Sequence, residues 1–275
     1  MRGEASLAAD KGARQAFAPL LQQAGTGAID VAQELFSFVT LLDQYPQLER
    51  ALTDPSRPDT DKERVVSELL AGRAQDLTVS IVKDLSTRYW SKVKHIANAV
   101  EDLAVDAMAY YTDALGITDQ VADELTQVHS AFVDYPIVLF RLSDEYSKPQ
   151  ARVNLLDELL VGKGLHKETM QLVEQATRDL RGRSFLHTID WLVDRFSAHM
   201  NETMVTVVTA VPLTHEQMAK LVDVYSQKLG RAIYINAIVN PEVIGGMRVE
   251  YGSQVTDNTV LTQLKQLQRQ MAISS

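Results

Sequence analysis

The sequence contains an internal repeat, and this repeat limits the folds that are open to the chain. Residues 31–72 align without a gap onto residues 121–162, at a constant offset of 90 residues, and 12 of the 42 aligned pairs are identical. Ordinary composition gives about two or three identities over such a length. The identical pairs include a Tyr-Pro dipeptide in each copy. We therefore predict a tandem duplication of a domain of roughly 90–100 residues.

Each copy of the repeat has a helical pattern. In the first copy, Leu35, Phe38 and Leu42 recur at helical spacing until Tyr45-Pro46, where proline disfavours helical dihedrals in the residue before it. Further apolar stripes predict helices over residues 8–23, 62–70, 77–89 and 93–115. The last of these helices is long, and its second half must also open the second copy. We therefore predict two bundles that share a helix.

The C-terminal part of the chain has a different pattern, in which β-branched strands alternate with helices. Strands are predicted over residues 204–211, 232–239, 246–251 and 254–255, and helices over 214–229 and 258–271. Thr214 and Gln217 form a capping box at the start of the first of these helices.

The predicted fold is mainly α with a small α/β part. Two tandem helical bundles, residues 1–105 and 106–200, are followed by a C-terminal β-α-β-β-β-α module over residues 201–275.

Composition excludes several functions. The 275 residues carry a net charge of −9, which has the wrong sign for contact with a phosphate backbone, so we expect no nucleic acid partner. Cysteine is absent, so disulfides and thiolate sites are excluded. No stretch of about 18 apolar residues without a charge is present, so we expect no insertion into a membrane.

Residues that could carry enzymatic chemistry are present, but they are not arranged for it. The six histidines never have the spacing that puts two metal ligands on one helix face. The acidic pairs Glu101-Asp102 and Asp144-Glu145 are expected to cap helices or face water. Gly162-Lys163-Gly164 matches Gly72 of the first copy and is expected to be the loop after a helix. We therefore predict a protein that is not an enzyme and needs no cofactor or metal.

The end of the chain resembles a known family. Residues 238–252, followed by Val255-Thr256-Asp257, resemble the C-terminal signature of the delta subunit of F-type ATP synthases, whose mitochondrial counterpart is the oligomycin-sensitivity-conferring protein. Residues 51–58 and Arg181-Gly182-Arg183 are similar to the longer actinobacterial form, in which the helical domain is duplicated. The resemblance covers essentially the whole chain.

The resemblance implies a stator subunit without catalytic activity, which ties the catalytic head of the synthase to its peripheral stalk and resists rotor torque. Its implied partners are the N-terminal helices of alpha subunits, bound by a helical bundle, and the C-terminal region of the b subunit, bound by the C-terminal module. It also implies one copy in a hetero-oligomeric complex, as a peripheral protein at the cytoplasmic face of the cell membrane. A free-standing soluble helical adaptor or regulatory protein is the alternative.

Candidate site residues follow from the pattern and the resemblance together. The glycines of the signature turn are expected to adopt positive φ or to allow close approach of another strand. The sequence favours this structural role over a phosphate-binding loop, because the glycines neither lead into a helix nor carry the Lys-Ser/Thr of a P-loop. The signature turn consists of Gly245, Gly246, Gly252 and Asp257. The candidates for partner contacts are Phe17, Leu20, Leu21, Ile81, Leu85, Val260, Leu264 and Leu267.

Both groups of partner candidates have a second interpretation. The stripe of Phe17, Leu20 and Leu21 faces that of Ile81 and Leu85, and it is either a seam inside the bundle or a groove for an added helix. The stripe on the last predicted helix either packs on the sheet of its own module or meets a partner helix. The pattern alone leaves these alternatives open.

Overall fold

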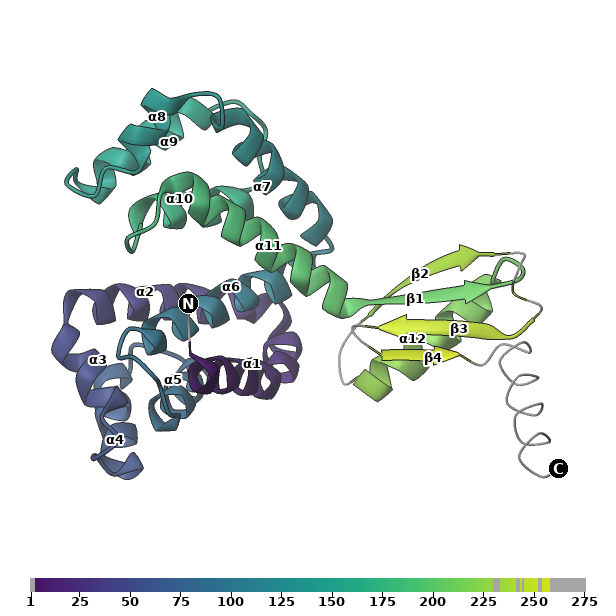
Figure 1. Ribbon diagram of the computed structural model, residues 1–275, viewed down its shortest axis with the longest axis horizontal. Helices are drawn as coiled ribbons and strands as arrows, with labels where there is room; N and C mark the ends of the chain where they lie inside the picture. Colours follow the sequence, from purple (N-terminus) through teal and green to yellow (C-terminus); the bar gives the residue numbers. More distant parts are fainter. Residues whose placement is uncertain (1–2, 230–232, 241–242, 244, 252–253, 258–275) are drawn as a thin grey trace. The chain divides into compact units, whose positions relative to one another are not determined.

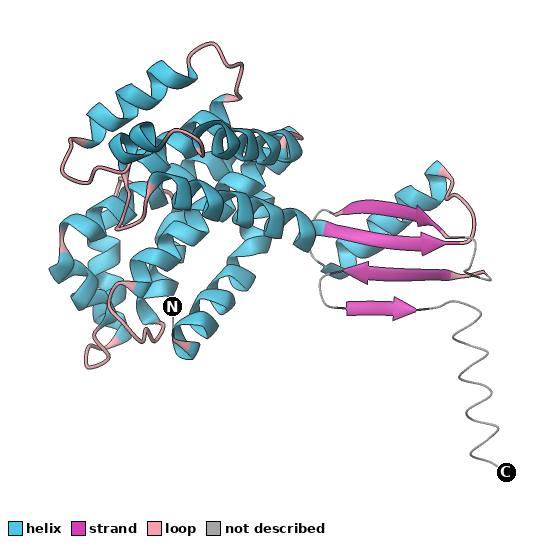
Figure 2. Cartoon of the chain, turned by 45° about the horizontal axis from the view of Figure 1, so that its top comes forward, coloured by secondary structure: helices cyan, strands magenta, loops and turns pink. Residues whose placement is uncertain are grey.

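The chain divides into two compact units, residues 1–197 and 198–275. The first unit is helical, and the second contains a sheet with a helix, as the computed structural model shows (Figures 1 and 2). The prediction of a mainly α chain with a small α/β part is therefore confirmed. The structure describes residues 3–229, 233–240, 243, 245–251 and 254–257.

The first bundle is built around two long helices, α2 and α6, which pack along each other. On α2, Val31, Leu35, Phe38 and Leu42 are buried on one face, as their spacing predicts. The elements of this bundle are α1 (Glu4–Ala24), a short 3-10 turn (Gly25–Gly27), α2 (Ala28–Gln44), α3 (Pro46–Thr53), α4 (Asp59–Leu70), α5 (Asp76–Thr87) and α6 (His95–Leu115).

The second bundle repeats these helices in the same order. Its helices α7, α8 and α9 begin 90 residues after α2, α3 and α4, at the offset of the sequence repeat. The elements are α7 (Thr118–Phe132), α8 (Pro136–Leu142), α9 (Pro149–Leu160), α10 (Lys167–Arg178) and α11 (Phe185–Thr203).

Helix α6 is shared by the two bundles. It closes the first bundle against α2, and it takes in the second bundle the place that α1 has in the first (Figure 1). Every residue from 99 to 112 is buried, so this helix has no face toward solvent over almost four turns. The predicted boundary at residue 105 falls inside this helix.

In both copies, a glutamate side chain from another helix caps the N-terminus of a helix. Glu34 on α2 accepts hydrogen bonds from the backbone N–H of Gln75 at 3.1 Å and the hydroxyl of Thr78 at 2.5 Å. Ninety residues later, Glu124 on α7 accepts hydrogen bonds from the backbone N–H of His166 at 2.9 Å and from the hydroxyl of Thr169. Each carboxylate thus binds the positive N-terminal end of a neighbouring helix, α5 or α10.

The C-terminal unit contains a four-stranded sheet with the order β2-β1-β3-β4. β1 is parallel to β2 and antiparallel to β3, and β3 is antiparallel to β4. The elements are β1 (Met204–Thr209), α12 (His215–Leu229), β2 (Tyr234–Val239), β3 (Met247–Tyr251) and β4 (Gln254–Asp257). The predicted order of the first five elements is confirmed, and the predicted helix over 258–271 lies outside the described residues.

Helix α12 connects the two parallel strands of this sheet. The predicted capping box is present: Thr214 N–H donates to Gln217 Oε1 at 2.9 Å, and Gln217 N–H donates to Thr214 Oγ1 at 3.2 Å. Tyr225 of the helix is buried in one cluster with Val205, Val207 and Val249 of the strands, so the module has its own core.

We expect Glu124→Gln to lower the stability of the helical unit by about 1–2 kcal/mol at pH 7, because it weakens the charged cap of α10. Burial acts to raise the pKa of Glu124, but the hydrogen bonds from Thr169 and His166 outweigh it and hold that pKa below its ordinary value. The carboxylate therefore stabilises the fold above the pKa of the unfolded chain, and this stability is lost as pH falls through the folded value.

The check is urea unfolding of the full chain at pH 7 and pH 4. The difference in the free energy of unfolding between wild type and Glu124→Gln should be smaller at pH 4 than at pH 7. Glu158→Gln, at an exposed position on α9, should have the same free energy of unfolding as wild type at both pH values. An equal difference in the free energy of unfolding at both pH values would contradict the proposed role of the Glu124 carboxylate as a helix cap.

Candidate functional site

The predicted stripes on α1 and α5 meet inside the first bundle. Phe17 and Leu21 of α1 are buried, and so are Ile81 and Leu85 of α5. These four side chains are part of the bundle core, as the interpretation of a seam requires. Leu20 differs, because 43% of its surface is exposed on the outer side of α1.

Helix α1 has an open side, whereas its counterpart in the second copy has none. α1 buries a single stripe, and Leu7 and Leu20 are exposed away from it. α6 occupies the same position in the second bundle, but α2 of the first bundle covers its other side. The first copy therefore leaves its opening helix accessible, and the second copy does not.

The buried part of α6 carries carboxylates that are bound by arginines from other segments of the chain. Asp106 accepts a hydrogen bond from Nε of Arg14 on α1 at 2.6 Å, and it also binds Arg195 on α11. Arg195 further donates to the backbone carbonyl of Asp102 at 3.1 Å. A single carboxylate thus connects the first helix of one bundle with the last helix of the other.

Two further arginines bind Glu101, which precedes Asp106 by five residues on α6. Arg181 donates to Glu101 at 2.6 Å and to Asp43 on α2 at 2.7 Å, while Arg183 also binds Glu101 and stacks over the ring of Trp191. Burial acts against the charge on Arg181, but Glu101 and Asp43 outweigh it and raise its pKa above the ordinary value. The Arg-Gly-Arg sequence before α11 therefore binds the first bundle to the second.

The expectation that Glu101 and Asp102 cap helices or face water is wrong, because both are buried on α6. Four further residues of these contacts were not predicted from the sequence: Asp43, Asp106, Arg14 and Arg195. The available signal was the presence of four acids on a helix that is otherwise mostly apolar, three of which, Glu101, Asp102 and Asp106, are buried. Their partners are 80 to 93 residues away in the sequence, so local spacing could not identify them.

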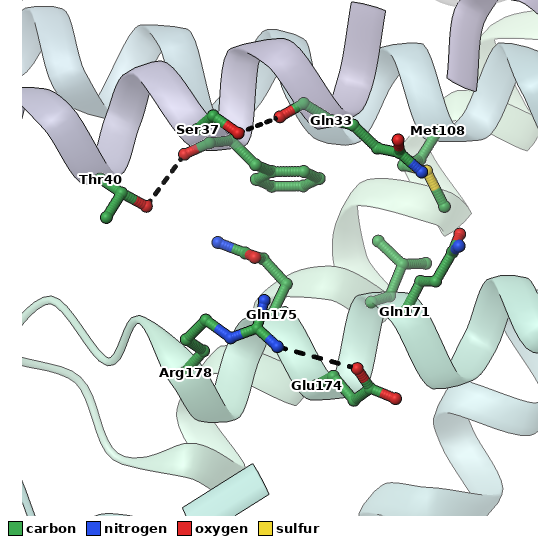
Figure 3. A pocket seen from close by; sticks show the side chains of 10 residues that line it. Gln33, Ser37, Thr40, Met108, Gln171, Glu174, Gln175 and Arg178 are labelled. Atoms are coloured by element: carbon green, nitrogen blue, oxygen red, sulfur yellow. Dashed lines mark hydrogen bonds and ion pairs between the residues drawn. The ribbon is translucent and has the colours of Figure 1, made fainter. Parts of the chain in front are cut away.

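A groove lies between α2 and α10, and Met108 of α6 also lines it (Figure 3). It has a volume of about 280 Å³, and its walls carry several amide and hydroxyl groups. Ser37 and Thr40 donate to carbonyls of their own helix, and Arg178 pairs with Glu174 at 4.0 Å. The pKa of Glu174 is raised above its ordinary value by burial and by nearby Asp157, although Arg178 acts in the opposite direction. The labelled side chains line the groove from both bundles.

This groove lacks the arrangement of a hydrolytic or acid-base site. Its lining contains one carboxylate, Glu174, where paired acid-base catalysis needs two groups with separated pKa values. Among the described residues, no three His, Cys, Asp or Glu side chains are grouped to hold a metal ion. No helix in the described part of the chain is long and apolar enough to cross a membrane.

The signature turn of the C-terminal unit has the predicted backbone geometry where it is described. Gly245 has φ 103° and Gly246 has φ 81°, both in the region that L side chains rarely adopt. Asp257 is the last residue of β4, in register with Arg248 of β3. Gly252, Val260, Leu264 and Leu267 lie outside the described residues.

We expect Arg195→Met to destabilise the helical unit by about 2–3 kcal/mol, because it removes one of the two cations on a buried carboxylate. Arg64→Met is the matched control: the Arg64–Asp61 pair is exposed and should contribute less than about 0.5 kcal/mol. Thermal unfolding of the full-length variants measures both. If Arg195→Met and Arg64→Met lower the stability by the same small amount, the contact of Arg195 with Asp106 contributes little to the stability of the fold.

Comparison with known proteins agrees with this organisation. A family model described as the ATP synthase delta (OSCP) subunit matches residues 105–271, which include most of the second bundle and the C-terminal unit. The ATP synthase subunit delta of Bifidobacterium longum subsp. infantis is 50% identical over 98% of both chains. The protein of the same name from Beutenbergia cavernae is 35% identical over 98% of both chains.

These matches agree with the resemblance seen in the sequence. The family model covers more than half of the chain, and the two relatives are matched over nearly their whole lengths. The chain belongs to the ATP synthase delta (OSCP) subunit family.

Proposed function

We propose that this chain is a non-catalytic stator subunit of F-type ATP synthase, linking the α/β catalytic head to the membrane-anchored b subunit and resisting rotor torque. Membership of the family is the observation that carries the proposal. The division into a helical unit and an α/β unit supports it, because a link between two partners needs two attachment surfaces. The subunit acts as a peripheral protein at the cytoplasmic face of the cell membrane.

The first bundle is the proposed attachment to the head. Its opening helix α1 has an accessible side with Leu20, whereas α6, its counterpart in the second copy, is covered. An N-terminal helix of an alpha subunit would lie on this side of α1 and bury an apolar stripe there. A helix held along its length dissociates slowly without a covalent bond, which suits a part under sustained torque.

The second bundle is proposed to lengthen the connector between the head and the stalk. Two features support a stiff connection: α6 runs without interruption through both bundles, and Glu101 and Asp106 bind arginines from across the junction. The C-terminal unit is the proposed attachment to the b subunit. Leu264 and its neighbours on the predicted terminal helix are the candidate contacts.

We expect Leu20→Asp to weaken binding of the full-length chain to the isolated α/β head by at least about tenfold, because a charge would replace an apolar contact in the interface. The fold should be unaffected, since Leu20 is exposed. Leu115→Asp, at a leucine that is 40% exposed near the end of α6, is the matched control. Calorimetric titration measures the affinities, and unchanged binding by Leu20→Asp would reject the site on α1.

We expect Leu264→Asp to weaken binding to the soluble part of the b subunit while binding to the head is retained. Val224→Asp, at an exposed position on α12 of the same module, should bind b normally. Circular dichroism checks that both variants keep the fold. Normal binding of b by a folded Leu264→Asp variant would contradict the assignment.

A further inference from the structure

The turn between α10 and α11 has a backbone conformation that its sequence does not favour. Arg181 has φ 52° and Gly182 has φ 74°, and the N–H of Arg183 donates to the carbonyl of Leu180 at 2.9 Å. Positive φ at both central residues is the pattern of a type I′ turn, in which Gly, Asn and Asp dominate. The Cβ atom of an arginine crowds the backbone in this conformation. Among the described residues, Arg181 is the one non-glycine residue with positive φ.

The first copy joins its equivalent helices without such a turn. α5 and α6 correspond to α10 and α11, and Arg88, the residue after α5, has φ −79° and ψ 156°, in the extended region. In the connection 88–94, which the structure describes in full, every residue has negative φ. The repeated fold therefore does not require a left-handed residue between these helices, so contacts particular to the second copy hold Arg181 in its conformation.

The side chain of Arg181 is bound by the first bundle. Only 9% of this side chain is exposed, and its guanidinium group donates to Asp43 on α2 and to Glu101 on α6. The same group reaches the backbone carbonyl of Ala97 on α6 at 3.5 Å. Arg181 makes these contacts only while the turn lies against α2 and α6. Glu101 is also bound by Arg183, so it keeps a partner when Arg181 is replaced.

The backbone of the same turn is bound by the second bundle. The N–H of Gly182 donates to Glu145 Oε1 at 3.0 Å. The N–H of Phe185, at the start of α11, donates to Ser143 Oγ at 2.9 Å. Both acceptors lie in the loop between α8 and α9. The turn is therefore held from two sides, by its arginine side chain on the first bundle and by its N–H groups on the second.

We propose that residues 180–183 form a latch, which keeps its left-handed conformation only while the two bundles are in contact. When Asp43 and Glu101 no longer bind Arg181, nothing offsets its unfavourable φ, and the residue returns to the negative φ that L residues prefer. The chain then changes direction before Gly182, and the N–H groups of Gly182 and Phe185 lose their acceptors in the α8–α9 loop. Separation of the bundles thus loosens the start of α11. The inference concerns contacts inside the helical unit and does not rest on the proposed function.

Hydrogen exchange of the full-length chain, labelled with ¹⁵N-phenylalanine and followed by NMR, tests the latch. Asp43→Asn removes a charge that lies on the first bundle, at an exposed position. Exchange of the Phe185 N–H should become at least about fivefold faster, because the open form of the turn is more populated. The rates at Phe38 on α2 and at Phe196, further along α11, should stay as in wild type. Asp61→Asn, at an exposed ion pair of the first bundle, is the matched control and should leave all three rates unchanged.

Two substitutions of Arg181 separate the cost of its backbone conformation from the loss of its contacts. Arg181→Ala and Arg181→Gly remove the same ion pairs, but glycine adopts positive φ without a clash. Exchange of the Phe185 N–H should therefore be at least about threefold faster in Arg181→Ala than in Arg181→Gly. Adding Asp43→Asn to either variant should produce no further change, because Asp43 acts on the turn through Arg181. Circular dichroism checks that the variants keep the fold.

Any of three results would overturn the latch. If Asp43→Asn and wild type exchange the Phe185 N–H at the same rate, the order of the turn does not depend on contact with the first bundle. If Arg181→Ala and Arg181→Gly exchange it at the same rate, the left-handed conformation carries no cost. If Asp43→Asn speeds exchange at Phe38 and Phe196 as much as at Phe185, the whole helical unit is destabilised and the turn does not open by itself.

Discussion

The helical unit depends on the burial of α6 together with its acidic side chains. A buried carboxylate without a partner is strongly destabilising, so Glu101 and Asp106 require the arginines that reach them from α1, α11 and the turn before α11. These contacts need a defined geometry, because a guanidinium group binds a carboxylate well in only a few orientations. The ion pairs therefore fix how one bundle is set against the other, and the apolar residues of α6 provide most of the burial.

The sequence predicted the helices well because each has a strong local signal. The Tyr45-Pro46 dipeptide ends α2, and a capping box begins α12, so both boundaries depend on neighbouring residues alone. The shared role of α6 was also predictable, since a repeat of this length left no other helix to open the second copy. Where the signal is local or repeated, sequence and structure agree.

The contacts between the bundles could not be predicted in the same way. Arg181 and Glu101 are 80 residues apart, and no periodic pattern links them. Periodicity also failed to distinguish Leu20 from the core residues Phe17 and Leu21, because an apolar residue on a helix gives the same signal whether its environment is the core or solvent.

The shared helix has a consequence for how such a chain can grow. When two domains are joined by a flexible loop, each duplication adds a joint, and the distance between the two ends of the molecule then varies. Here one copy ends and the next begins within α6, so the duplication added five helices without adding a joint. A duplication of this kind adds helices in fixed steps of one repeat, and a continuous helix still joins consecutive copies.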